Sequence, residues 1–101
     1  MKMLMHVRFP LEPFNAAVRD GSAGQKLQAI LKAIKPDAAY FTTTSGQRGG
    51  TFVVNAKDSS SLPSLAEPFF LVFNATVEFE TFMTPEDLGR AGIDSLGKEW
   101  G

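Results

Sequence analysis

The sequence predicts an α+β fold in which four strands and two main helical regions follow one another in the order β-α-β-β-α-β. Four segments show the alternating or β-branched pattern of strands, and the segments between the first and second and between the third and fourth place apolar side chains at helical spacing. The composition agrees, because 44% hydrophobic and 21% charged residues are typical of globular proteins. A length of 101 residues suits a single domain, residues 1–101.

The first strand is expected over residues 3–9, where apolar side chains alternate with a mixed set. Pro10 and Pro13 end its pairing, because proline cannot donate a hydrogen bond to a neighbouring strand. The alternation separates two faces. One carries Met3, Met5, Val7 and Phe9, and the other carries Leu4, His6 and Arg8.

A helical region follows the first strand in two pieces. Residues 14–20 form a short helix that Gly21 interrupts. Ser22 and Gln25 have the spacing of a capping box and predict the start of a longer helix, which stops before Pro36. The buried stripe of this helix is Leu27, Ile30, Leu31 and Ile34.

Two strands, residues 38–44 and 51–57, are predicted to form a hairpin around a glycine-rich turn at residues 45–50. On the second of these strands the sequence leaves two assignments open. Either Phe52 and Val54, or Val53 and Asn55, face the helices.

The second main helix should begin after the cap candidates at residues 58–61 and stop at Asn74, with a kink or a shifted start at Pro68. A fourth strand is expected over residues 76–83. Thr84 then starts a short C-terminal helix as its N-cap, with proline next and two acidic residues in the first turn. Its apolar spacing, at Leu88, Ile93, Leu96 and Trp100, is suited to docking on a surface.

This order of elements, with right-handed crossovers, predicts a ferredoxin-like βαββαβ sandwich with a short C-terminal helix. Both helices then cover one face of the sheet and leave the other face open. The open face carries Leu4, Tyr40 and Phe82 among charged side chains, and so much apolar surface is unusual for a monomer. We therefore expect a homodimer in which two such sheets pack face to face.

The element order, the barrel-lining alternation and the MTPEDL segment after the last strand resemble the dimeric α+β barrel superfamily, in particular its small uncharacterised bacterial proteins. Relatives in that superfamily include muconolactone isomerases, antibiotic-biosynthesis monooxygenases and YCII-like proteins. The resemblance covers nearly the whole chain and is architectural. It implies a homodimer with a pocket between sheet and helices in each subunit, and it implies no particular reaction.

Six polar side chains on the strands are candidates for binding a ligand: His6, Arg8, Tyr40, Asn55, Glu78 and Glu80. His6 is either a general base or a half-buried side chain paired with an acid of the neighbouring strand. Arg8 either clamps a substrate carboxylate while a glutamate accepts a proton, or joins Glu78 and Glu80 in a structural charge network. Tyr40 and Asn55 are suited to orienting a small polar ligand.

Several functional classes are disfavoured by the sequence. Ten basic and eleven acidic side chains nearly cancel, so no basic field is present to hold nucleic acid or an anionic membrane. The longest apolar run, residues 69–73, is far shorter than the roughly 20 residues that span a bilayer. No motif for a cofactor or a metal is present. The absence of cysteine and of a signal-peptide pattern fits a cytoplasmic protein.

Three functions remain open at this stage. The first is a homodimeric barrel that binds a small organic molecule. The second is a cofactor-independent enzyme of the isomerase or monooxygenase type, in which His6 or Tyr40 works with a glutamate. The third is a structural or interaction protein whose barrel is filled by side chains.

Overall fold

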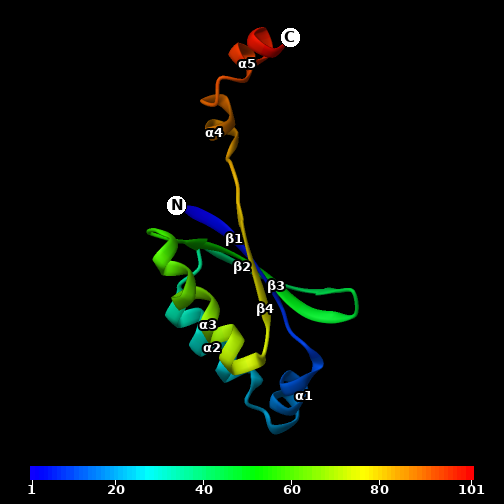
Figure 1. Ribbon diagram of the computed structural model, residues 1–101. Coiled ribbons are helices and arrows are strands. Elements are labelled where there is room, and N and C mark those ends of the chain that lie inside the picture. The colour runs from blue at the N-terminus through cyan, green and yellow to red at the C-terminus, as the bar shows by residue number, and fades with distance from the viewer.

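The computed structural model describes residues 1–101 and contains one four-stranded antiparallel sheet (Figure 1). Its strands are β1 (Lys2–Arg8), β2 (Ala38–Thr44), β3 (Gln47–Asn55) and β4 (Thr76–Thr81). They lie in the order β2-β3-β1-β4, so β1 is central and pairs with both β3 and β4. This is the ferredoxin-like arrangement that the order of elements predicts.

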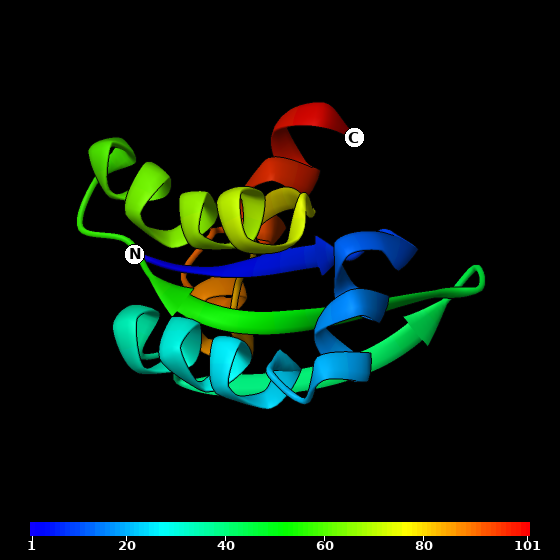
Figure 2. The ribbon, with the colours of Figure 1, turned by 90° about the horizontal axis from the view of Figure 1, so that it is seen from below.

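Three helices cover one face or one end of the sheet, and two more follow β4. The first three are α1 (Leu11–Asp20), α2 (Ala23–Ile34) and α3 (Leu62–Phe73), with a short 3₁₀ helix, η1 (Ser59–Ser61), before α3. Figure 2 shows α2 and α3 lying along the strands and α1 beside the end of β1. The last two helices are α4 (Pro85–Gly89) and α5 (Ile93–Trp100). No helix combines the length and the apolar composition that a membrane span requires.

The core lies between the sheet and the helices, and alternation along the strands decides which side chains enter it. The buried apolar side chains of the strands are 0–7% exposed and belong to Met3, Met5, Val7, Phe52 and Val54. The structure thus decides between the two assignments left open for β3, because Phe52 and Val54 face the helices whereas Val53 and Asn55 face outward.

Aromatic rings fill the core at the end of the sheet nearest α1. The Phe9 ring packs edge-on against Phe14 and Phe73, with centroid separations of 5.1 and 5.3 Å. Phe52 stacks on Phe69 at 5.5 Å. Because β3, α1 and α3 each contribute rings to this cluster, it joins the three elements into one core.

The β2–β3 turn is shorter than predicted. Only Ser45 and Gly46, both with positive φ, form the turn, and β3 already begins at Gln47. Residues 47–50 pair with β2 and therefore belong to the strand. A two-residue turn with left-handed backbone fits the twist of a hairpin, which leaves Gly49 and Gly50 inside the sheet.

The predicted capping box at Ser22 is wrong. Ser22 has a helical backbone conformation, and its buried hydroxyl has no hydrogen-bond partner, whereas an N-cap requires an extended backbone. The reason is the tight junction with α1. Gly21 ends α1 in the left-handed conformation, and the Asp20 carboxylate accepts the Ser22 N–H at 2.8 Å.

The second capping prediction is confirmed. The Thr84 hydroxyl accepts the Asp87 N–H and the Asp87 carboxylate accepts the Thr84 N–H, both at 3.1 Å. The expected shift in the start of α3 at Pro68 does not occur, since the helix begins at Leu62 and includes Pro68. The tail helices do not dock on the sheet or on α1 to α3; they extend beyond the end of β4 (Figure 1).

Candidate functional site

The open face of the sheet is built from rows of side chains that lie opposite one another on neighbouring strands. The row nearest α1 contains Thr76, Arg8, Gly49 and Thr42, in the order β4, β1, β3, β2. The next row contains Glu78, His6, Thr51 and Tyr40. The third row contains Glu80, Leu4, Val53 and Ala38. The face therefore has a polar end in the first two rows and a more apolar end in the third.

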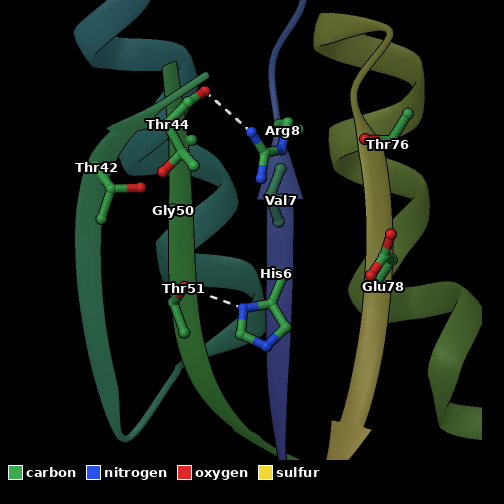
Figure 3. A pocket seen from close by; sticks show the side chains of 10 residues that line it. His6, Val7, Arg8, Thr42, Thr44, Gly50, Thr51, Thr76 and Glu78 are labelled. Atoms are coloured by element: carbon green, nitrogen blue, oxygen red, sulfur yellow. Dashed lines mark hydrogen bonds between the residues drawn. The ribbon is translucent and has the colours of Figure 1, made fainter. Parts of the chain in front are cut away.

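A concavity of about 270 Å³ lies at the polar end (Figure 3). Its side chains come from all four strands, and all but one of its lining residues are polar or glycine. The residues are His6, Val7, Arg8, Thr42, Thr44, Gly49, Gly50, Thr51, Thr76 and Glu78. Such a volume and lining suit a small, polar molecule that accepts and donates several hydrogen bonds.

Gly49 forms the floor of this concavity. A Cβ atom at this position would lie 2.9 Å from the Val7 carbonyl oxygen, so no side chain fits without displacing the strand. Its missing side chain also leaves a gap in the first row between Arg8 and Thr42. The hollow thus exists because a glycine occupies the middle of a strand.

The Arg8 side chain extends from β1 over β3, where this gap lies, and reaches β2. Its guanidinium donates from Nη1 to the Thr44 carbonyl oxygen on β2 at 2.9 Å (Figure 3). The charge network expected between Arg8 and the two glutamates of β4 does not form, because no carboxylate lies within ion-pair distance of Arg8. The residue opposite Arg8 on β4 is Thr76, and the glutamates belong to the next rows. Arg8 therefore brings an uncompensated positive charge to the concavity.

His6 is held by hydrogen bonds on both sides of its ring. Nδ1 lies 3.1 Å from the Thr51 hydroxyl, and Nε2 lies 2.9 Å from the Glu80 carboxylate. The expected acid partner of His6 is thus present, and it is the diagonal Glu80 rather than Glu78 directly opposite. Glu78 lines the concavity, and its carboxylate forms no ion pair and no hydrogen bond with His6, whose ring contacts Thr51 and Glu80 instead. No group of three metal-ligating side chains forms around these residues.

Tyr40 and Asn55 lie outside the concavity. Tyr40 is exposed on the edge strand β2, opposite Thr51. Asn55 lies at the other end of the sheet, where its amide donates to the Asp37 carboxylate at 3.2 Å. Lys2 pairs with the same carboxylate at 3.1 Å, and this contact lowers the pKa of Asp37 below its ordinary value. Of the six sequence candidates, three line the concavity, namely His6, Arg8 and Glu78, and Glu80 contacts His6 from outside it.

A second concavity, of about 340 Å³, lies between α1 and the β2–β3 hairpin. It is lined by Phe9, Phe14, Phe41, Thr42, Thr43, Arg48 and Gly49. The Arg48 guanidinium lies 4.5 Å from the Phe14 ring centroid and donates to the Asn15 side-chain oxygen at 2.8 Å. This is where the family resemblance places a pocket, between sheet and helix, yet it contains none of the six candidate residues. The predicted residues and the predicted location of the pocket therefore fall in two different concavities, which share only Thr42 and Gly49.

Sequence reasoning did not assign a binding role to Thr44, Gly49, Thr51 or Thr76. Thr44 shares the parity of Tyr40 on β2, and Thr76 shares the parity of Glu78 on β4, so alternation was a sufficient signal for these two. Thr51 lies on β3, whose two faces the sequence left open. The sequence did not indicate a role for Gly49, because residues 45–50 were assigned to a turn rather than to a strand.

No protein-family model matches the sequence, and no curated protein matches it either. A solved structure does match. It is a 5-chloro-2-hydroxyhydroquinone dehydrochlorinase from Burkholderia phenoliruptrix AC1100, in complex with 2,5-dihydroxybenzoquinone. The two structures agree with a TM-score of 0.61 and 16% sequence identity, over 85% of this chain and 97% of that chain. The likeness shows the fold alone, and it agrees with the ferredoxin-like α+β arrangement of the sheet described above.

Proposed function

We propose that this protein is a homodimeric α+β barrel that binds a small organic molecule carrying an anionic oxygen and a nearby hydroxyl group. The ligand occupies the concavity at the polar end of the open sheet face. The observation that carries this proposal is the meeting of Arg8, His6 and Glu78 in a hollow of about 270 Å³.

Arg8 supplies recognition of the anionic oxygen. A guanidinium has five N–H donors, and Arg8 uses one of them on the Thr44 carbonyl oxygen. The remaining donors are available to a carboxylate or an enolate, and no protein carboxylate competes for them. The Glu78 carboxylate, which forms no ion pair in the protein, accepts a hydrogen bond from the hydroxyl group of the same ligand.

The second copy of the chain is expected to pack on the open face, where Leu4, Val53 and Phe82 are only half-buried. Packing a partner sheet over the apolar row removes this surface from water and leaves the polar end as an enclosed site. The structural neighbour supports a ligand of this class, because that dehydrochlorinase is in complex with a small oxygen-rich ring.

Binding is measured by calorimetric titration with 2,5-dihydroxybenzoquinone and with a panel of small hydroxy acids and keto acids. Losing a charged hydrogen bond costs about 1.5–3 kcal/mol, so Arg8→Gln is expected to weaken binding by about tenfold or more. Arg19→Gln is the matched control, because Arg19 lies on α1 and pairs with Glu12 at 3.4 Å. Equal affinity of the two variants, or no binding of any compound by the wild type, contradicts the proposal.

A second candidate function, a cofactor-independent enzyme, is favoured by the 2.9 Å contact between His6 and Glu80. A histidine held by a carboxylate on one ring nitrogen is suited to moving a proton with the other. That other nitrogen faces the Thr51 hydroxyl, which a substrate must displace. In D₂O, an active enzyme exchanges a carbon-bound proton of its ligand for deuterium. His6→Gln then abolishes the exchange and Tyr40→Phe preserves it, because Tyr40 lies outside the concavity. Exchange that survives His6→Gln contradicts this assignment.

A further inference from the structure

The chain divides into a body, residues 1–81, and a C-terminal arm, residues 82–101. The arm leaves the sheet at the end of β4, beside the start of β1, and continues away from the body (Figure 1). The molecule measures 60 × 29 × 19 Å, with a radius of gyration of 17.3 Å. A compact chain of this length has a radius of gyration of about 13 Å. The arm therefore gains no stability from packing on its own body.

The arm nevertheless carries an apolar stripe. Ile93, Leu96 and Trp100 lie at the i, i+3, i+7 positions of one face of α5 and are 52%, 47% and 82% exposed. Leu88 on α4 and Met83 before it are also exposed. Isolated helices shorter than about 12 residues are marginal in water. Helices of five and eight residues therefore need another surface to stabilise them.

The local structure directs the arm away from its own body. The segment between β4 and α4 runs straight (Figure 1), and the reciprocal hydrogen bonds of Thr84 and Asp87 fix the start of α4. Pro85 restricts the backbone at the same point. Folding the arm back onto its own sheet requires a reversal within this short segment. A surface on another molecule requires no such reversal.

The net charges of the two parts also favour contact between the arm of one copy and the body of another copy of this chain. The arm has four acidic and two basic side chains, whereas the body has seven acidic and eight basic side chains. Arm and body therefore have opposite net charges, which favours their contact and disfavours contact between two arms.

We infer that two copies of this chain exchange their C-terminal arms, so that Ile93, Leu96 and Trp100 of each copy pack against the body of the other. The inference rests on the homodimer proposed above and adds the arm to its interface. Exchange is reciprocal in a two-fold dimer, so both arms become buried together.

Trp100 is the only tryptophan and reports directly on the arm. The 101-residue chain is diluted through its dissociation range. Its mass is followed by light scattering, and its tryptophan emission and acrylamide quenching are followed by fluorescence. In the exchanged dimer the Trp100 emission is blue-shifted and protected from acrylamide. On dilution the emission shifts to that of an exposed indole, in step with the loss of dimer mass.

Two variants of the 101-residue chain provide the comparison. Leu96→Asp places a charge in the stripe and is expected to weaken dimerisation by about tenfold or more, with Trp100 exposed at concentrations that keep the wild type dimeric. Ser95→Asp adds the same charge on the opposite side of α5 and leaves the mass and the emission unchanged.

Three outcomes overturn the inference, and they differ in what they leave standing. A dimer with exposed Trp100 excludes exchange of the arms and leaves the face-to-face homodimer intact. A monomer with protected Trp100 shows that the arm folds back on its own body. A monomer with exposed Trp100 at all concentrations excludes the homodimer as well. The titration with small acids tests the ligand site separately from all three.

Discussion

The two faces of the sheet are made by the same strands but have opposite properties. On the covered face, Met5, Phe52 and Val54 are 0% exposed and pack against helices. On the open face, their sequence neighbours His6, Thr51 and Val53 are half-buried, and the side chains of His6 and Thr51 share one hydrogen bond. Because neighbouring residues point in opposite directions, a strand contributes to stability with one residue and to the candidate site with the next. Substitutions on the two faces should therefore separate folding from binding.

The largest effect is expected on the covered face, from Phe52→Ala. The Phe52 ring contacts Phe41 and Phe69, with centroid separations of 5.6 and 5.5 Å, so its removal leaves a cavity in the core. We expect a loss of about 3–5 kcal/mol in the free energy of unfolding, measured by urea denaturation.

The matched control is Val53→Ala on the adjacent residue of the open face. Val53 is only half-buried, so its truncation should cost about 1 kcal/mol. Equal losses in the free energy of unfolding for the two variants would contradict the difference between the two faces of the sheet.

A smaller effect is expected at Gly49, which affects both stability and the candidate site. In Gly49→Ala the new methyl group meets the Val7 carbonyl oxygen, and the strand has to shift. We expect a loss of about 1–3 kcal/mol in the free energy of unfolding, together with loss of ligand affinity, because the floor of the concavity is filled.

Gly24→Ala is the control for this substitution. Gly24 lies in α2, and a Cβ there contacts nothing within 4 Å. Alanine has the higher helix propensity, so this variant should gain roughly 0.5–1 kcal/mol in thermal or urea denaturation. A stabilised Gly49→Ala variant with full affinity contradicts the role assigned to Gly49.

The smallest effect concerns the far end of the open face, where Lys2 and Asn55 hold Asp37. The Lys2 contact lowers the pKa of Asp37 in the folded protein. Its contribution to stability is therefore present above the unfolded pKa of an aspartate and is lost as the pH falls through the folded pKa.

Denaturation from neutral to acidic pH tests this contribution with Lys2→Met. The variant should be less stable than the wild type near neutrality, and the difference should vanish once Asp37 is protonated. Lys32→Met on α2 is the control, because Lys32 forms no ion pair. A difference that persists unchanged at acidic pH contradicts the assignment of the effect to Asp37.

The sequence alone determined the order of elements, the two faces of β1 and β4 and the cap at Thr84. These features depend on residues close together in the chain. Alternation assigns a side chain to one face of a strand, and a capping box needs only four consecutive residues. The pairing of His6 with an acid of β4 was also predictable, since the topology makes β1 and β4 neighbours.

Only the tertiary structure decided the contacts that depend on register between distant segments. Whether Arg8 meets Glu78 or Thr76 follows from how β4 aligns with β1, which no local pattern specifies. Gly49 becomes the floor of the concavity only because it lies opposite Arg8 and beside the Val7 carbonyl oxygen. The direction of the arm likewise follows from the path of β4. A shift of register by one residue exchanges the two faces of a strand, so these long-range alignments place the site where the local sequence cannot.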